Sequence, residues 1–253
     1  MLDGAYRQAK AFVLAVQFLT RFPTPHIFDV DAQDVDRSYA YYPAVGALLG
    51  GTYVFFALLI HIFYASSLLL AVLLAGLQIY LTGGLHVDGL MDTADGLLSY
   101  RSREQTLNIM KDSRVGAMGV MVFAVTLLVR IAVYQSLSLP SLISLLFITP
   151  FYSRSALLVL LRFTHPARTE GLGRQAVGKT NLSTIVLANG IVLLLVFALL
   201  HWIGLIGLIV ASLLIIRFVR TCKRRIGGMT GDTFGAAIEL LEVTLALVIA
   251  LRP

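Results

Sequence analysis

The stretch that decides the fold is residues 182–219, which reads LSTIVLANGIVLLLVFALLHWIGLIGLIVASLLIIRFV. Its only formally charged side chain is Arg217. A helix that crosses a bilayer needs ~20 mostly apolar residues. A run of this length and polarity therefore predicts two membrane-spanning helices, over residues 182–202 and 204–219.

The rest of the chain has the same character. Of its 253 residues, 58% are hydrophobic and 13% are charged, whereas a soluble domain has ~45–50% and ~25%. This composition excludes both a soluble protein and a disordered one, which would be rich in charge. The sequence predicts an all-α polytopic membrane helix bundle of about seven transmembrane helices, the other five covering residues 41–63, 66–85, 115–137, 142–162 and 234–251.

We interpret residues 1–253 as a single membrane domain. Phe12, Ala15, Val16 and Leu19 recur at helical spacing, which predicts an amphipathic helix at the membrane interface within an N-terminal segment, residues 1–40. Residues 86–114 form an acidic connection that we expect to hold the active site.

Basic residues favour one orientation. The connections near Tyr64, Ser138 and Ile203 are short and lack Lys and Arg, whereas the N-terminal segment and the other connections are long and basic. By the positive-inside rule, the N-terminus and the long loops are cytoplasmic and the C-terminus lies outside. The net charge of +6 is therefore taken as a record of topology, and nucleic acid is not expected as a partner.

Residues 83–96, GGLHVDGLMDTADG, are the most informative segment for function. Asp88, Asp92 and Asp95 are spaced i, i+4 and i+7, which places them on one helical face. Like charges so placed repel unless a cation intervenes, and Mg²⁺ is commonly held by carboxylates and substrate phosphates. The alternative is a solvated acidic face, but we favour a metal site because the chain has only 14 acidic residues. His86 is either a packed residue or a base.

Cations lie near this segment. Lys111, Asp112 and Arg114 precede the third predicted span, and both cations suit phosphate recognition. The alternative is anchoring at the membrane surface, which we favour for Arg101 and Arg103.

A second glycine-rich segment, residues 227–237, precedes the last predicted span. Asp232, Glu239 and Glu242 project from much the same side of this helix, and the two glutamates fall inside the span. An ionisable residue there is a functional candidate by default. The alternative is that Arg130 and Arg154, in the third and fourth spans, form buried ion pairs with these glutamates.

Residues 173–180, GRQAVGKT, formally fit the phosphate-loop pattern of nucleotide hydrolases. That motif works between a parallel strand and a helix, whereas here it leads from a polar loop into a span. We reject the motif but keep Lys179 as a residue that can contact phosphate.

Several of these segments together resemble the adenosylcobinamide-GDP ribazoletransferases, also called cobalamin (5′-phosphate) synthases. The resemblance runs through nearly the whole chain, with Val87 and Met91 replacing the expected Leu and Ala. It rests on FLTRFPTP at 18–25, residues 83–96, KDSRVG at 111–116, EGLG at 170–173, residues 178–179 and residues 227–242.

The resemblance implies a Mg²⁺-dependent enzyme of the bacterial inner membrane. Such an enzyme transfers the cobinamide phosphate moiety of adenosylcobinamide-GDP to α-ribazole or its 5′-phosphate and releases GMP. Small molecules and membrane lipid are then its partners, and a homo-oligomer is left open. The implied metal ligands are Asp88, Asp92, Asp95, Asp232 and Glu239. The implied catalytic residues are His86, Asp92, Asp112 and Asp232. The implied substrate-binding residues are Arg21, Lys111, Arg114, Arg154, Lys179 and Thr230.

Two alternatives remain open from the sequence. A CDP-alcohol phosphotransferase of lipid synthesis also carries helix-borne aspartates, but Asp92-Thr93 stands where that family has Ala-Arg. A secondary transporter would use intramembrane carboxylates for ion coupling, but it should show inverted repeats, and we find no convincing repeat.

Overall fold

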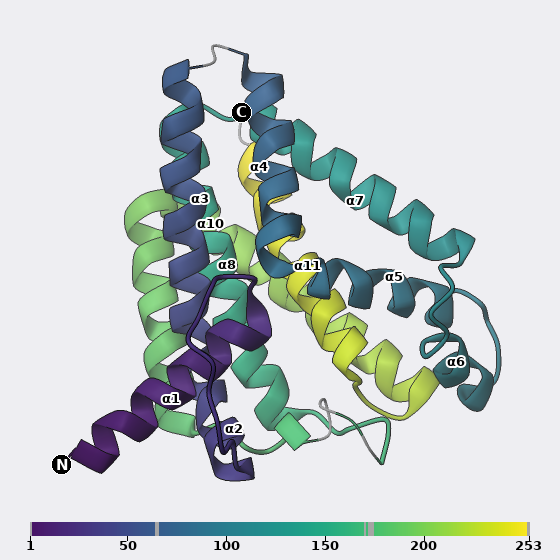
Figure 1. Ribbon diagram of the computed structural model, residues 1–253. Helices are drawn as coiled ribbons and strands as arrows, with labels where there is room; N and C mark the ends of the chain where they lie inside the picture. Colours follow the sequence, from purple (N-terminus) through teal and green to yellow (C-terminus); the bar gives the residue numbers. More distant parts are fainter. Residues whose placement is uncertain (1, 64–65, 170, 172–174, 252–253) are drawn as a thin grey trace.

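The computed structural model describes residues 2–63, 66–169, 171 and 175–251. This part of the chain is helical apart from its connections and one isolated β-bridge (Figure 1), so the predicted all-α fold is confirmed. The elements are α1 (Leu2–Leu19), α2 (Ala32–Ser38), η1 (Tyr39–Tyr41), α3 (Tyr42–Phe63), α4 (Ser67–Thr82), α5 (Leu85–Leu97), α6 (Arg103–Ile109), α7 (Ala117–Ser136), α8 (Leu139–Phe163), α10 (Leu182–Ile226) and α11 (Gly231–Ala250).

Among the described residues, five helical segments are long and apolar enough to cross a membrane. They are Ala32–Phe63, which includes α3, together with α7, α8, α10 and α11. A sixth crossing results if α4 and α5, which meet at 90°, are counted as one bent span. We treat α5 as lying outside the spans because it turns away from α4 and carries three aspartates. The number of crossings stays a prediction.

The two runs predicted over residues 182–219 belong to α10, which folds sharply back on itself. His201 interrupts the helix with a φ of 51° and a ψ of −147°. A Cβ added at Gly204 would lie 3.3 Å from the carbonyl oxygen of Val196, eight residues earlier. In a straight helix these positions would be ~12 Å apart along the axis. The 45-residue helix therefore consists of two limbs.

Small residues bring the helices close together around α11, which packs against α5, α7, α8 and α10. In the neighbouring α3–α8 contact, a Cβ added at Gly50 would lie 2.6 Å from the carbonyl oxygen of Phe147. Such close approach is typical of helices in lipid, where dispersion contacts replace the hydrophobic effect.

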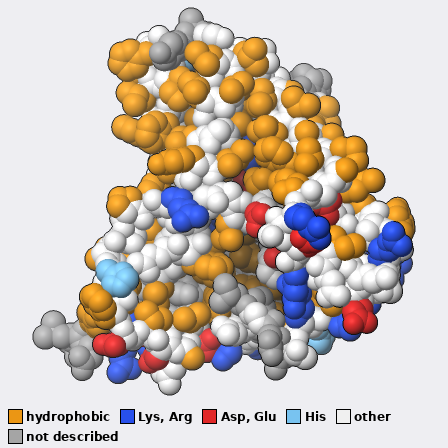
Figure 2. Space-filling model, turned by 45° about the vertical axis from the view of Figure 1, so that its right-hand side comes forward, with side chains coloured by type: hydrophobic (Ala, Val, Ile, Leu, Met, Phe, Trp, Pro, Cys, Tyr) orange, Lys and Arg blue, Asp and Glu red, His pale blue; other side chains and the backbone are white. Residues whose placement is uncertain are grey.

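The outer surface suits a bilayer. Large apolar side chains cover the upper part of the molecule and charged ones gather below (Figure 2). The end of α11 and the end of α3 lie at the top in Figure 1, and the N-terminus lies at the bottom. Helix α1 is present as predicted, and of its predicted apolar stripe Ala15, Val16 and Leu19 are buried and Phe12 is partly buried. Its position at the membrane interface stays a prediction.

Candidate active site

The acidic helix α5 is positioned by a glycine corner. Gly83 and Gly84 have φ values of 61° and 72°, a region that glycine enters without steric cost. The chain turns here by 90° between α4 and α5. The amide of Arg21 donates to the carbonyl oxygen of Leu81, 2.7 Å away, and so fixes the N-terminal segment beside the corner.

Helix α5 crosses α11 at two glycines. A Cβ added at Gly89 would lie 2.6 Å from the carbonyl oxygen of Asp232. A Cβ added at Gly235 would lie 3.3 Å from the Cα of His86. Because they lack a Cβ, these two glycines allow the backbones of α5 and α11 to approach closely. The crossing brings the carboxylates of α5 next to Asp232, which is far away in the sequence.

The three carboxylates of α5 differ in their surroundings. The pKa of Asp92 is raised to about 7, first by burial and then by the charges of Asp88, Asp232 and Asp95. Asp95 accepts hydrogen bonds from the amides of Gly116 and Gly119, each 2.8 Å long, and so caps α7. Within the described ranges, no three His, Cys, Asp or Glu side chains converge as a metal site.

Asp232 is held at the start of α11. Thr230 is the N-cap and forms a reciprocal capping box with Thr233, which satisfies amides that the helix leaves unpaired. The Thr230 hydroxyl also donates to Asp232 Oδ2 over 3.2 Å. Arg168 forms an ion pair with the same carboxylate, with 3.5 Å between Arg168 Nη1 and Asp232 Oδ2.

Arg168 lines the cavity beside Asp232, although the sequence patterns did not single it out as a site residue. It reaches the site through backbone bonds between two distant segments. Ala167 donates its amide to the carbonyl of Met229, and Met229 donates to His165, over 2.8 and 2.7 Å. No local sequence pattern predicts this backbone pairing. The one available signal for Arg168 was its position two residues before the EGLG segment.

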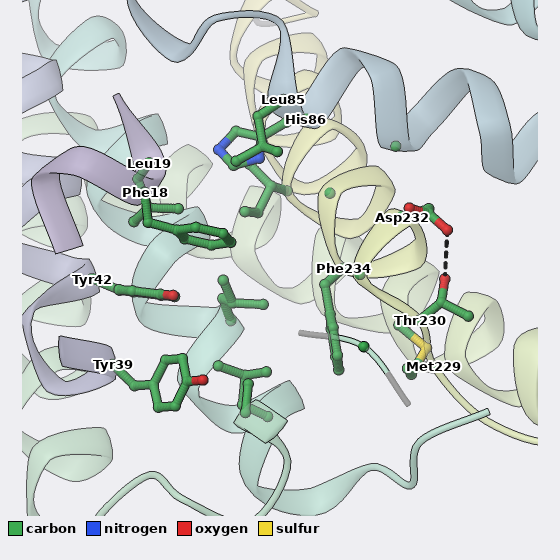
Figure 3. Close-up of a pocket in the computed structure, with 18 of the residues that line it drawn as sticks. Phe18, Leu19, Tyr39, Tyr42, Leu85, His86, Met229, Thr230, Asp232 and Phe234 are labelled. Carbon is green, nitrogen blue, oxygen red and sulfur yellow. Dashed lines mark hydrogen bonds between the residues drawn. The ribbon is translucent and has the colours of Figure 1, made fainter. Parts of the chain in front are cut away.

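A cavity of about 590 Å³ opens at this crossing (Figure 3). It is lined mostly by apolar and aromatic side chains, and it brings together four predicted site residues, His86, Asp88, Thr230 and Asp232. His86 is buried, and burial lowers its pKa well below the ordinary value, with a smaller effect of nearby arginines. Its Nε2 has no hydrogen-bond partner in the described part of the chain.

Glu239 and Arg154 belong to a separate buried cluster. Arg130 Nη2 lies 2.8 Å from Glu239 Oε2 and 3.6 Å from Glu242 Oε2. Arg154 pairs with Glu242, and the Ser153 hydroxyl donates to Glu242 Oε1 over 2.9 Å. The ion pairs considered from the sequence are confirmed. Glu239 faces Arg130 here, so its assignment as a metal ligand draws no support from this packing.

The other predicted substrate-binding residues lie outside the cavity lining. Arg114 pairs with Asp112 over 2.6 Å, and its hydrogen bonds lower the pKa of Asp112 to about 2. Lys179 pairs with Asp36 over 2.7 Å. Lys111 is exposed, and the Arg21 side chain lies against Gly83.

The rejected phosphate-loop match lies partly outside the described residues, since 172–174 are among those left out. In the part that is described, a helical turn at 175–176 precedes Lys179, and α8 ends just before this connection. The parallel strand that the motif needs is not found among the described residues preceding it.

Comparison with known proteins decides the family. A sequence profile of cobalamin-5-phosphate synthase matches residues 11–250. The chain belongs to the cobalamin-5-phosphate synthase family.

Three relatives named adenosylcobinamide-GDP ribazoletransferase illustrate the similarity. The proteins of Desulfitobacterium hafniense (strain Y51) and Desulforamulus reducens are each 40% identical, over 240 and 246 residues. These alignments cover 92% and 94% of this chain and 94% and 95% of the relatives. The protein of Brevibacillus brevis is 34% identical over 250 residues, 94% of this chain and 97% of its own.

Membership of the cobalamin-5-phosphate synthase family confirms the resemblance seen in the sequence, and it decides against the CDP-alcohol phosphotransferase and the transporter. No solved structure matches the chain. The geometry described above is therefore the basis for assigning roles to residues in this member of the family.

Proposed function

We propose that the chain is an adenosylcobinamide-GDP ribazoletransferase, the last enzyme of cobalamin nucleotide-loop assembly. A ribose hydroxyl of α-ribazole, or of its 5′-phosphate, forms a bond to the phosphorus that carries cobinamide. The bond from that phosphorus to the bridging oxygen breaks, GMP leaves, and the hydroxyl proton passes to a base. The observation that carries this proposal is the near full-length similarity to relatives of that name.

Asp88, Asp92 and Asp232 are proposed to hold Mg²⁺. Their oxygens are the donors that Mg²⁺ prefers, and it usually takes only one or two carboxylates while substrate phosphates complete its shell. Burial, and then the charges of the neighbouring carboxylates, raise the pKa of Asp92, and a cation would relieve the repulsion among these carboxylates. When bound, Mg²⁺ supplies neutralisation of the diphosphate charge.

The protein's own groups complete the site. Arg168 offers planar donors to a phosphate at the mouth of the cavity, and Asp232 holds its guanidinium in place. His86 lines the same cavity and its Nε2 has no hydrogen-bond partner among the described residues, so by position it is the candidate acceptor of the hydroxyl proton. Burial, which lowers its pKa, makes it a weak base until charge develops in the site. Asp112 is a weak base because its hydrogen bonds with Arg114 lower the pKa of its carboxyl group to about 2, and it does not line the cavity.

The proposal is tested with detergent-purified protein, Mg²⁺, adenosylcobinamide-GDP and α-ribazole 5′-phosphate, with GMP and cobamide as the measured products. Asp92→Asn should lower the rate on the order of a hundredfold, as removal of one charge-stabilising group does elsewhere. Glu104→Gln is the matched control, because Glu104 is an exposed carboxylate in the first turn of α6. Turnover of a CDP-alcohol substrate with no release of GMP would refute the assignment.

The orientation of the protein is also proposed. The bacterial inner membrane would hold it with the N-terminus and the cavity on the cytoplasmic side and the C-terminus in the periplasm. In support, the N-terminus and the end of α11 lie at opposite ends of the molecule. Lipid is then a direct partner of the exposed apolar surface, and the oligomeric state is left open.

A further inference from the structure

The cavity has two chemically different ends. Asp88, Asp232 and Arg168 lie at one end, near the crossing of α5 and α11. The remaining wall carries aromatic rings from α1, η1, α3 and α11. These rings belong to Phe18 of α1, Tyr39 of η1, Tyr42 of α3 and Phe234 of α11 (Figure 3).

The aromatic wall is organised around Tyr42. The ring of Phe18 is stacked on Tyr42, with centroids 6.1 Å apart and planes inclined by 15°. Tyr39 contacts the same ring edge-on at 5.5 Å and 83°. Phe234 projects into the space from the opposite side (Figure 3). Tyr39, Tyr42 and Phe234 are buried, so a flat aromatic ligand in this space would contact Phe18 over the largest area.

Phe18 is the most exposed ring of this wall. Its side chain is 44% exposed, although Val16 and Leu19 beside it on α1 are buried. Phe18 therefore turns a large aromatic face toward the cavity that no other side chain of the described chain covers fully.

The size and polarity of the cavity narrow the choice of ligand. Its volume of about 590 Å³ falls within the ~300–1,000 Å³ of small-molecule sites. The corrin macrocycle of adenosylcobinamide, with its amide arms, is far larger than a drug-sized ligand. Guanine carries donors and acceptors around its rim, each of which needs a polar partner when it is buried, whereas this cavity is lined mostly by apolar and aromatic side chains. The base of α-ribazole is a benzimidazole, which is flat and has few polar atoms.

We propose that the aromatic end binds the benzimidazole base of the incoming nucleoside, with Phe18 and Phe234 as the residues that determine affinity for it. The ribose then points toward Asp88 and Asp232, where its hydroxyl meets the diphosphate. This inference rests on the proposed function, since it assigns a place to one of the two substrates. The proposal therefore identifies the benzimidazole base of α-ribazole as the group that this cavity recognises.

Binding of free benzimidazole tests the subsite without any turnover. Equilibrium dialysis of radiolabelled benzimidazole against detergent-purified protein, without Mg²⁺, should show one saturable site. Phe18→Ala should weaken binding about five- to tenfold, as expected for loss of an aromatic contact worth ~1 kcal/mol. Phe234→Leu, which keeps apolar volume but removes the ring, should have a similar effect. Phe55→Ala is the matched control, because Phe55 is 60% exposed on α3 and does not line the cavity.

The competing occupant is a lipid acyl chain, which needs apolar volume and no ring. If Phe234→Leu and Phe18→Ala both bind benzimidazole as tightly as the wild type, or if no saturable site exists, the subsite is refuted.

Enzyme kinetics separate this failure from that of the proposed function. With the function correct, Phe18→Ala should raise the KM for α-ribazole 5′-phosphate five- to tenfold and leave the KM for adenosylcobinamide-GDP unchanged. If the wild type turns over but Phe18→Ala leaves the KM for α-ribazole 5′-phosphate unchanged, the subsite alone is overturned. If the wild type binds benzimidazole at a saturable site that needs Phe18 and Phe234 but releases no GMP, the proposed function alone is overturned.

Discussion

At the scale of single residues, Asp92 couples stability to pH. Its pKa of about 7 in the folded protein exceeds the ordinary value of 3.8, so the folded state binds more protons than the unfolded state between these values. The free energy of unfolding of the metal-free protein should therefore fall as pH rises from about 4 to 7 and then level off. Thermal unfolding in detergent at a series of pH values measures this.

Asp92→Asn is the comparison that isolates this effect. The variant should lose part of the pH dependence and should be more stable than the wild type at pH 8 without metal. Added Mg²⁺ should reverse the order, because only the wild-type carboxylate gains a cation. Identical pH profiles of the two proteins would contradict the raised pKa.

The buried arginines predict a different behaviour. Arg130→Met leaves Glu239 without its 2.8 Å partner, and an unpaired buried charge costs about 3–5 kcal/mol. We expect a large drop in melting temperature. The double variant Arg130→Met/Glu239→Leu should recover much of that loss, because no charge is then left unpaired. A double variant as unstable as the single one would show that the pair does more than balance charge.

At the scale of secondary-structure elements, the crossing of α5 and α11 depends on Gly89. A Cβ there would lie 2.6 Å from the carbonyl oxygen of Asp232, so Gly89→Ala must push the two helices apart. We expect the rate of GMP release to fall at least tenfold. Gly76→Ala is the matched control, since a Cβ on Gly76 of α4 meets nothing within 4 Å. Full activity of Gly89→Ala would refute this role of the crossing.

Helix α5 also shows where sequence reasoning succeeds and where it stops. Spacing predicted a helix with three carboxylates on one face, and α5 spans all three. The spacing of these aspartates does not predict which residues of other elements pack against that face of α5. Asp95 caps α7 through amides that follow it by 21 and 24 residues. Arg168 reaches Asp232 through a backbone pairing of distant segments. Both contacts are consequences of tertiary packing, which periodicity does not encode.

At the scale of the whole molecule, the class of fold followed from composition, because lipid accepts only helices or closed barrels across its core. The aromatic wall of the cavity was not predicted. Its residues come from α1, η1, α3 and α11, and each alone looks like an ordinary apolar residue. The hairpin at His201 was predicted only as a short connection near Ile203.

The orientation of the chain gives a prediction at this scale. A fluorescent protein that folds only in the cytoplasm should report when fused before α1 and stay dark when fused after α11. Alkaline phosphatase, which is active only in the periplasm, should give the opposite result. The physical reason is the concentration of Lys and Arg in the long connections. Equal signals from both ends would contradict the proposed topology.

The positions of the acids along α11 have an electrical consequence. Glu239 and Glu242 lie two to three turns beyond Asp232, ~10 Å or more further along the helix. They are balanced by Arg130 and Arg154. A cation that reaches Asp88 and Asp232 from the water therefore meets no unbalanced negative charge ahead of it. The negative charge available to a cation is thus confined to the crossing of α5 and α11, because the acids deeper along α11 are neutralised by arginines.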